Sequence, residues 1–171
     1  MNIEIRKVFH TDIELLQYIS KQTFLEAFAA DNSEQDMNMY LSENLSIKQL
    51  TVELNTPGTE FFFALRANQV IGYLKINSGN SQTELHDLQA IEIERIYVLK
   101  EFQRKSIGQA LFEIAVHKAL QIHATCIWLG VWEHNTKAIN FYKKNGFVEF
   151  GKHNFLLGTD NQTDIMMKRL V

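Results

Sequence analysis

Apolar and polar positions alternate at the start of the chain and then adopt helical spacing. Residues 3–8 (IEIRKV) alternate with the period of a β-strand. Over residues 11–28 the apolar positions recur at helical intervals, and Thr11 followed by Glu14 has the spacing of a capping box. A second helical region extends over residues 33–55. We therefore expect one strand and two helical regions in the first third of the chain.

Strand patterns dominate the next segment. Residues 60–68 and 69–77 are rich in aromatic and branched side chains around a short turn, which predicts a hairpin. A polar surface loop follows at residues 78–89. Residues 90–99 alternate strictly, which predicts a strand with a defined face. That face is expected to carry Glu92, Glu94, Ile96 and Val98.

The remaining residues predict two helices and three strands. In chain order these are a helix starting at Ile107, a strand at 126–132, a helix between Asn135 and Gly146, and strands at 147–157 and 163–171 joined by a turn at 158–162. Asn135 suits an N-cap, and Gly146 suits the C-terminal stop of its helix. The order β-α-α-β-β-β-α-β-α-β-β predicts one mixed α/β domain, residues 1–171, with helices packed on one sheet.

Composition narrows the class of protein. The 171 residues are 46% hydrophobic and 22% charged, typical of a soluble globular domain. No apolar run is long enough to span a membrane, and the N-terminus carries charges where a signal peptide needs apolar residues. The single Cys126 excludes an internal disulfide and suits a reducing cytoplasm, and its strand context predicts a packed thiol. The six His residues lack metal-ligand spacing, so no metal site is expected.

The net charge of −3 is unevenly distributed along the chain. Residues 11–60 contain nine acidic and two basic side chains, a local net charge of −7, which leaves +4 elsewhere. The split has two interpretations, both open. It marks either solvated helix faces, or an N-terminal half that faces a cationic ligand and a C-terminal half that faces an anionic one.

An unusual helix start occupies residues 101–120 (EFQRKSIGQALFEIAVHKAL). Arg104 and Lys105 stand beside small residues at the positive end of the helix dipole, where acidic side chains are usually preferred. This is either a solvated turn or an anion site in which free backbone N–H groups and two cations hold a strongly negative ligand. The segment has neither the P-loop nor the dinucleotide-binding fingerprint.

Two longer stretches decide between these alternatives by resemblance. IERIYVLKEFQRKSIGQALF and, after the next strand, IWLGVWEHNTKAINFYKKNGF are similar to the GNAT family of acetyl-CoA-dependent N-acetyltransferases. The family signature (Q/R)-x-x-G-x-(G/A) aligns with residues 103–108, except that Ser106 replaces its first Gly. The resemblance covers nearly the whole chain. It implies a central, mostly antiparallel sheet of six to seven strands, splayed between strands 4 and 5 and flanked by about four helices.

The resemblance also implies which residues hold acetyl-CoA. Backbone N–H groups from Arg104 to Gln109 would bind the pyrophosphate, and Gln103 would bracket the loop. The main chain of strand 4 would bind the pantetheine arm, and the Val98 N–H would polarise the thioester carbonyl. The implied cofactor residues are Tyr97, Val98, Gln103, Arg104, Lys105, Ser106, Ile107, Gly108, Gln109, Asn135, Ala138, Phe141, Tyr142 and Lys144.

An amine acceptor creates a proton problem. An alkylamine with a pKa of about 10.4 is neutral only roughly once in 2,500 molecules at pH 7, so a base is valuable. Glu94 is the predicted base, because it shares the expected face of Val98 and resembles a strand glutamate of related polyamine acetyltransferases. Four strand residues span about 13 Å, so the proton would travel through ordered water. Glu92 is the second choice, and an exposed strand face is the alternative for both.

The departing CoA thiol presents a smaller problem. Its pKa of about 8.5 makes the thiolate a fair leaving group, so an acid helps modestly. Tyr142 matches the acid proposed for the family; the alternative is that it only packs against its helix. No covalent acyl-enzyme is needed, because the amine can attack the thioester directly through a tetrahedral intermediate.

The acceptor is expected over the acidic N-terminal helices, where carboxylates stand among aromatic side chains that suit a cationic amine. The predicted acceptor residues are Phe24, Glu26, Phe28, Asp31 and Tyr40. Within the family, the chain looks most like spermidine/spermine N-acetyltransferases. Alternatives are another small amine, a protein N-terminus or lysine, or a transcriptional regulator that binds acetyl-CoA. The acidic chain lacks a basic stripe, so direct nucleic-acid binding is not expected; the resemblance leaves room for a homodimer.

Overall fold

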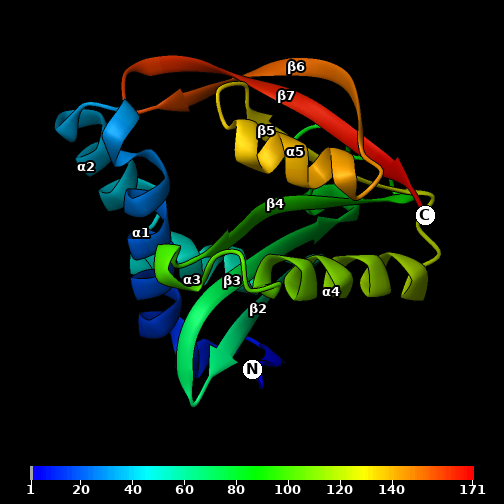
Figure 1. Cartoon of the computed structure of the whole chain (residues 1–171), viewed down its shortest axis with the longest axis horizontal. Helices are drawn as coiled ribbons and strands as arrows, with labels where there is room; N and C mark the ends of the chain where they lie inside the picture. Colours follow the sequence, from blue (N-terminus) through cyan, green and yellow to red (C-terminus); the bar gives the residue numbers. More distant parts are fainter. Residues whose placement is uncertain (1) are drawn as a thin grey trace.

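A single sheet organises the protein (Figure 1). The computed structural model describes residues 2–171; the predicted domain also includes Met1, which lies outside the described residues. Seven strands pair in the order β1-β2-β3-β4-β5-β7-β6. They are β1 (Glu4–Lys7), β2 (Thr59–Arg66), β3 (Gln69–Ser78), β4 (Ala90–Val98), β5 (Cys126–Trp132), β6 (Val148–Leu157) and β7 (Asp160–Leu170). Every neighbouring pair is antiparallel except β4–β5, which confirms the predicted sheet.

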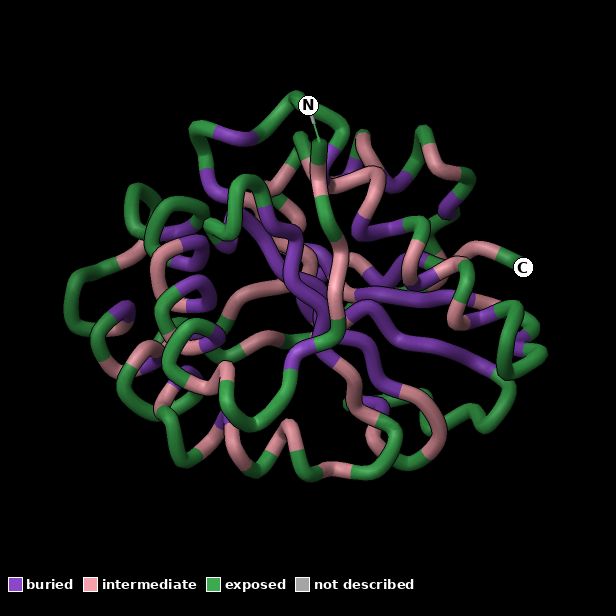
Figure 2. The backbone as a smooth tube through the Cα atoms, turned by 90° about the horizontal axis from the view of Figure 1, so that it is seen from below, coloured by how far each residue is buried: buried purple, intermediate pink, exposed green. Residues whose placement is uncertain are grey.

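Five α-helices of residues 2–171 cover the two faces of this sheet. They are α1 (Ile13–Phe28), α2 (Glu34–Glu43), α3 (Ile47–Asn55), α4 (Ile107–Gln121) and α5 (Thr136–Lys144). Figure 1 shows α4 and α5 in front of the sheet and α3 behind it. Strand β2 is therefore buried from both sides, as its continuous apolar run suggests. Phe62 lies under Lys118 of α4, whereas Phe61 lies under Lys75, which pairs with Glu53 of α3. Figure 2 shows this buried centre enclosed by exposed segments.

The second helical region contains two helices rather than one. Ser33 and Ser46 each accept a hydrogen bond from the backbone N–H three residues ahead, at Asp36 and Gln49, both at 3.1 Å. Each serine thereby caps a new helix. The helix count is therefore five rather than about four, and the element order gains one helix between β1 and β2.

Two predicted boundaries were wrong. The capping box of Thr11 and Glu14 does not form, because Arg6 pairs with Asp12 at 2.8 Å and Asp12 accepts the Phe9 N–H, so a 3-10 turn precedes α1. The closing turn is shorter than 158–162, because β6 and β7 remain paired to Leu157 and Asp160. The cap at Asn135 is confirmed, since its Oδ1 accepts the Ala138 N–H.

A β-bulge in β4 corrects the predicted face of that strand. Lys75 of β3 stands opposite Arg95, and the next residue, Ile76, stands opposite Ile93, so Glu94 is an extra residue. Glu94 and Arg95 consequently both reach the side chains on the α3 face of the sheet. Beyond the bulge the alternation is shifted by one, so Glu94 and Val98 lie on opposite faces, contrary to the prediction.

Among residues 2–171, no helix has the length and apolar character required to cross a membrane.

Candidate active site

The site lies where β4 and β5 separate. These parallel strands pair only from Ala90–Cys126 to Glu92–Trp128, and their later residues have no ladder between them. A cavity of about 1130 Å³ occupies the resulting gap and is lined by residues from both faces of the sheet. It therefore passes through the sheet, and the predicted splay between strands 4 and 5 is confirmed.

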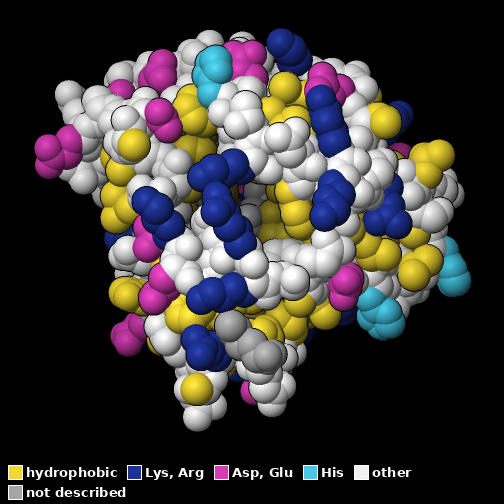
Figure 3. Space-filling view, viewed as in Figure 1, with side chains coloured by type: hydrophobic (Ala, Val, Ile, Leu, Met, Phe, Trp, Pro, Cys, Tyr) yellow, Lys and Arg dark blue, Asp and Glu magenta, His cyan; other side chains and the backbone are white. Residues whose placement is uncertain are grey.

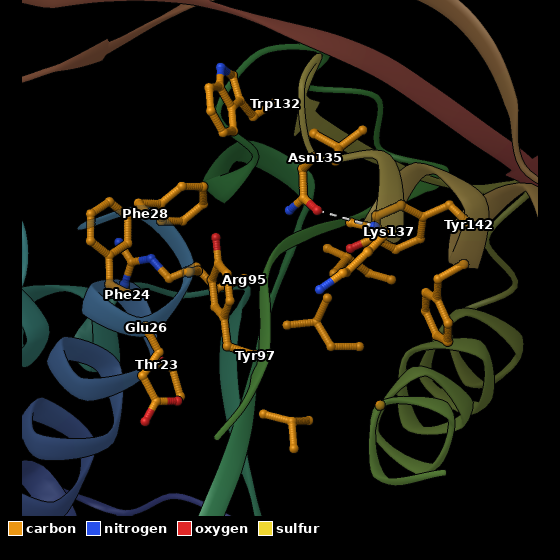
Figure 4. Close-up of a pocket in the computed structure, with 18 of the residues that line it drawn as sticks. Thr23, Phe24, Glu26, Phe28, Arg95, Tyr97, Trp132, Asn135, Lys137 and Tyr142 are labelled. Atoms are coloured by element: carbon orange, nitrogen blue, oxygen red, sulfur yellow. Dashed lines mark hydrogen bonds between the residues drawn. The ribbon is translucent and has the colours of Figure 1, made fainter. Parts of the chain in front are cut away.

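The cavity has two halves (Figure 4). The cofactor half is lined by residues 103–104 and 106–109 and by α5. The acceptor half is lined by α1, α2, β6, β7 and the α1-facing side chains of β4. Figure 4 shows Phe24 and Phe28 on one side of the β4 end and Asn135, Lys137 and Tyr142 on the other. Both Glu94 and Val98 line the cavity although they lie on opposite faces, because the cavity crosses the sheet between them.

The loop before α4 builds the cofactor half from its backbone. Arg104 and Ser106 both have left-handed conformations, with φ of 60° and 61°. The side chain of Ser106 does not cap the helix, so the first N–H groups of α4 have no side-chain partner there. Gln103 Nε2 donates to the Val98 carbonyl at 3.1 Å and ties the loop to the end of β4. These features form a concave set of backbone donors suited to an anion.

Gly108, in the first turn of α4, has no packing reason to be glycine. A Cβ at this position would have no protein atom within 4 Å, and Gly108 lines the cavity. The missing side chain therefore keeps cavity space free rather than allowing close protein packing. Ser106 explains the glycine preference of the family signature, because its left-handed φ is the conformation that glycine adopts without steric cost.

Basic side chains surround the cofactor half. Lys100, Arg104, Lys137 and Lys144 line the cavity, and Figure 3 shows Lys and Arg side chains around a hollow on this face. Lys105 was predicted in this set but is absent from the lining, because its Nζ donates to the Glu101 carbonyl at 2.9 Å.

The Val98 N–H points into the gap between the strands. Leu99 donates its N–H to the Ile71 carbonyl on the β3 side at 2.9 Å. Successive N–H groups of a strand point in opposite directions, so the Val98 N–H faces away from β3 and toward β5. With β5 splayed away at this level, this donor is available to a carbonyl oxygen in the cavity.

Tyr142 of α5 both packs against its neighbours and lines the cavity, and its role as an acid stays a prediction. Its ring lies 5.4 Å from Phe141 and 5.6 Å from Phe147, measured between centroids. Burial raises the pKa of Tyr142 well above its ordinary value. The hydroxyl therefore stays protonated at neutral pH, is a weaker acid than an ordinary tyrosine, and can donate a hydrogen bond.

Aromatic rings form most of the acceptor half. Phe24 stacks on Tyr40 with 4.3 Å between centroids, and Phe28 lies 6.2 Å from both Tyr97 and Trp132. Phe24, Glu26, Phe28 and Tyr40 thus line the cavity as predicted. Asp31 does not, because it lies beside a separate cavity of about 200 Å³.

Glu94 enters the cavity wall inside a network of buried charges. Its carboxylate lies 2.6 Å from Lys75 Nζ and 3.2 Å from Arg95 Nη2, and Glu53 of α3 pairs with the same two cations. Burial alone would raise the pKa of Glu94, but Arg95 and Lys75 outweigh burial and leave that pKa below its ordinary value. Glu94 is therefore a carboxylate at neutral pH and a weaker base than a free glutamate.

Glu92 does not line the cavity. Its carboxylate accepts hydrogen bonds from the backbone and hydroxyl of Thr83 and from Asn77. Burial raises the pKa of Glu92 despite these bonds. Glu92 therefore fixes the loop after β3 onto the sheet. It is not on an exposed strand face, and it lies outside the cavity in which a base would act.

Several lining residues were not identified from the sequence. They are Arg95, Trp132, Lys137, Phe155, Gln162 and Asp164. Trp132 and Lys137 flank the Asn135 cap in the stretch LGVWEHNTK and could have been found there. The others come from the bulge or from the final hairpin, whose distance from the loop at residues 103–108 in sequence hides their position.

The family follows from comparison with known proteins. Residues 21–147 match the Acetyltransferase (GNAT) family. The chain is a GNAT acetyltransferase. It is 40% identical over 167 residues to an uncharacterised N-acetyltransferase of Lactobacillus delbrueckii subsp. lactis, covering 98% of this chain and 96% of that protein. It is 26% identical over 151 residues to the spermidine N(1)-acetyltransferase of Thermoplasma acidophilum, covering 86% and 89% of the two chains.

Solved structures share the fold of this GNAT protein. The PaiA N-acetyltransferase of Thermoplasma acidophilum, crystallised with coenzyme A, has a TM-score of 0.81 and 23% identity over the whole of both chains. The ribosomal-protein-S18-alanine N-acetyltransferase of Escherichia coli has a TM-score of 0.73 and 17% identity, covering 99% of this chain and 94% of that one. At these identities the likeness concerns the fold.

Acetyl-CoA is the acetyl donor of this GNAT protein, as of its family. The cofactor half fits it: free helix N–H groups, the open space beside Gly108 and four cations suit a pyrophosphate. All the predicted cofactor residues except Lys105 line the cavity.

Proposed function

We propose that this GNAT protein acetylates a primary amine of a small polycationic acceptor, with spermidine and spermine as the first candidates. The observation that carries the proposal is the acceptor half itself. Stacked aromatic rings and three carboxylates, Glu26, Glu94 and Asp164, line the cavity opposite the basic cofactor half, and Arg95 is the cation among them. Aromatic faces and carboxylates both attract alkylammonium groups.

The shape of the acceptor half favours a small acceptor over a protein segment. The tip of the β6–β7 hairpin reaches α2, where Asp36 accepts the backbone N–H of Thr159 at 2.6 Å. Nearby, Gln162 Nε2 donates to Asn32 Oδ1, also at 2.6 Å. These bonds hold the hairpin, including the lining residues Phe155 and Gln162, against the α1–α2 region. The spermidine acetyltransferase among its relatives supports the same class of acceptor.

The roles of the site residues follow from this proposal. Residues 103–109 hold the CoA pyrophosphate, and Asn135, Ala138, Phe141 and Lys144 flank the pantetheine. The Val98 N–H binds the thioester oxygen as negative charge develops on it, when the neutral amine attacks directly. The buried Tyr142 hydroxyl donates to the departing thiolate. Glu94 attracts the ammonium and stays a predicted proton acceptor through water, although its ion pairs weaken it as a base.

An acceptor screen tests the proposal. Purified protein with acetyl-CoA should release free thiol fastest with spermidine or spermine, compared by kcat/KM with monoamines, lysine and peptides bearing a free N-terminus. A peptide as the best acceptor would contradict the small-amine assignment and leave GNAT membership intact. Absence of thiol release with any amine would contradict the proposed reaction.

A further inference from the structure

A chain of three titratable side chains connects the acceptor half with solvent. Asp164 of β7 lines the cavity and is 9% exposed. Its Oδ2 lies 3.3 Å from Nε2 of His153 on β6. The other ring nitrogen, Nδ1, lies 2.8 Å from the Glu84 carboxylate in an ion-pair contact, and its angle there does not make a hydrogen bond. The Glu84 side chain is 40% exposed. Carboxylate, imidazole and carboxylate thus follow one another from the cavity to the surface.

Strand register fixes the inner end of this chain. Asp164 stands opposite Trp132 of β5 and also opposite His153 of β6, so the three side chains share one face. Trp132 faces Phe28 across the acceptor half. The Asp164 carboxylate is therefore next to the aromatic rings that would hold the acceptor ammonium.

Gly130 makes room for this arrangement. A Cβ at position 130 would lie 2.9 Å from His153 Cε1 and 3.3 Å from Asp164 Oδ2. Gly130 lies two residues before Trp132 on the same strand face. The glycine therefore lets the imidazole ring lie against β5 beside Asp164.

Asp164 is a buried carboxylate of the cavity and Glu94 a half-buried one, with 20% of its side chain exposed, and their partners differ. Glu94 contacts two permanent cations, Lys75 and Arg95. Asp164 contacts only the imidazole of His153 among the described basic side chains. Burial raises the pKa of Asp164 above its ordinary value even though His153 opposes the shift. Of the two, Asp164 is the stronger proton acceptor.

Resting on the proposed function, we propose that Asp164 accepts the proton of the acceptor ammonium and that His153 passes it toward solvent at Glu84. One N–H bond of the ammonium breaks, its electron pair stays on nitrogen for attack on the thioester, and the proton binds an Asp164 oxygen. The proton then moves to His153 Nε2. The Nδ1 proton leaves to the Glu84 carboxylate, 2.8 Å away, once a small rotation brings the two groups into hydrogen-bond geometry, and from Glu84 to water. Glu84 and Asp164 contact opposite nitrogens of one ring. Residues 2–171 contain no cluster of three or more His, Cys, Asp or Glu side chains that could hold a metal ion.

Other titratable groups lie near Asp164 and belong in any pH analysis. They are His153 on β6, Glu84 in the loop after β3, Tyr40 on α2, and Glu94 and Arg95 on β4. Tyr40 is buried and its pKa is raised by burial, so it stays neutral in the relevant range. Arg95 stays charged throughout. The pH dependence assigned to Asp164 must therefore be separated from the titration of Glu94.

Substitution of Asp164 tests the proposal through the protonation state of the amine. For Asp164→Asn, kcat/KM for spermidine, or for the fastest amine of the screen, should fall about 100-fold to 1,000-fold at pH 7. The loss should shrink to less than about tenfold near pH 10, where roughly a quarter of the amine is neutral in solution, compared with about one molecule in 2,500 at pH 7. A weakly basic amine that is already neutral at pH 7 should likewise be acetylated almost normally. Affinity for CoA, measured by calorimetry, should not change.

Three further variants keep the test decisive. Asp160→Asn removes the same charge from an exposed position of the same strand and should leave kcat/KM unchanged. The activity of Glu94→Gln should not recover at high pH or with weakly basic amines. For His153→Gln, kcat/KM should fall about tenfold at pH 7 and recover at high pH. This variant tests the proposal if Asp164→Asn does not fold.

The outcomes separate the two proposals. Normal activity of Asp164→Asn, or an equal loss at every pH and with every amine, overturns the role of Asp164 while the acetyltransferase proposal stands. Rescue of Glu94→Gln instead assigns the base to Glu94. If the wild-type protein acetylates no amine, the proposed function fails and the role of Asp164 fails with it.

Discussion

The two halves of the cavity are built in different ways. The cofactor half uses a continuous loop, residues 103–109, whose backbone N–H groups provide the donors. The acceptor half is made of side chains from α1, α2, β4, β6 and β7, which lie far apart in the sequence. The first therefore depends on local backbone conformation, and the second on long-range packing.

This difference has a consequence for substitution. The acceptor half should be sensitive to changes in distant partners that hold its side chains, such as Lys75 and Glu53 beneath Glu94 and Arg95. The cofactor half should respond to changes in the loop alone, with little effect on folding. Four substitutions test this contrast, in order of decreasing expected effect.

Lys75→Met should disturb the acceptor half most. Lys75 is 5% exposed at its side chain and joins Glu53 to Glu94 at 2.9 and 2.6 Å. Its removal leaves two buried carboxylates to share Arg95, so the free energy of unfolding should fall by about 3 kcal/mol. Urea denaturation would measure the loss. The exposed Lys48→Met in α3 is the control, and an equal change in both would contradict a special role of the network.

The same variant has a defined pH signature. The folded-state pKa of Glu94 lies below its ordinary value of 4.5, so its contribution to stability is present above that value and is lost as pH falls through the folded-state pKa. Lys75→Met removes one of the two cations that lower the pKa of Glu94. The difference in unfolding free energy between wild type and variant should therefore be largest above pH 5 and shrink in acid.

Tyr142→Phe should affect the chemistry at the boundary of the two halves. Removal of the hydroxyl should lower kcat about 100-fold, within the range of general acid catalysis, because the thiolate loses its proton donor. CoA affinity should change little, since the ring and its contacts with Phe141 and Phe147 remain. Tyr18→Phe, at an exposed position of α1, is the matched control. An unchanged kcat would assign Tyr142 a packing role alone.

Gly108→Ala should affect only the cofactor half. The added methyl meets no protein atom but enters the cavity, so CoA should bind about tenfold more weakly, or ~1.4 kcal/mol. The unfolding free energy should stay constant or rise by up to about 1 kcal/mol, because alanine is the better helix former. Calorimetric titration with CoA and thermal unfolding measure the two effects. Reduced stability with unchanged CoA binding would show that Gly108 allows close protein packing rather than keeping cavity space free.

Ser106→Gly should produce the smallest effect. Glycine removes the steric cost of the left-handed φ of 61°, roughly 1 kcal/mol, but gains freedom in the unfolded chain. We expect a net stabilisation below about 1 kcal/mol and unchanged or slightly tighter CoA binding. A weaker affinity for CoA in this variant would show that the serine hydroxyl contributes a hydrogen bond to the ligand.

The accuracy of the sequence-based predictions follows the same division. The loop at residues 103–109 forms a helix start in the cavity wall, as predicted, because a helix start with free N–H groups depends on neighbouring residues. Lys105 was misplaced only in its side chain, which turns to Glu101. In the acceptor half Asp31 was misplaced and Asp164 was missed, since their positions depend on the strands and helices that approach from elsewhere.

The bulge in β4 shows why strict alternation failed. The sequence of β4 carries no proline or glycine to mark an irregularity. Glu94 becomes the extra residue where Lys75 of β3 pairs with its carboxylate and Glu53 of α3 pairs with the next residue, Arg95. A period of two predicts a face only while each residue has its own partner across the ladder.

The amino-acid sequence by itself determined the order of the strands, every helix except the division of residues 33–55 into two, the position of the helix start at residues 103–109 in the cavity wall, and the family of this protein. Each depends on residues close together in the chain, through periodicity, capping and backbone freedom. Only the tertiary structure decided that Glu94 and Val98 lie on opposite faces, and that Asp164, His153 and Glu84 form one path from the cavity to solvent. These relations arise because the sheet places β4, β5, β7 and β6 side by side, an order that no local pattern records.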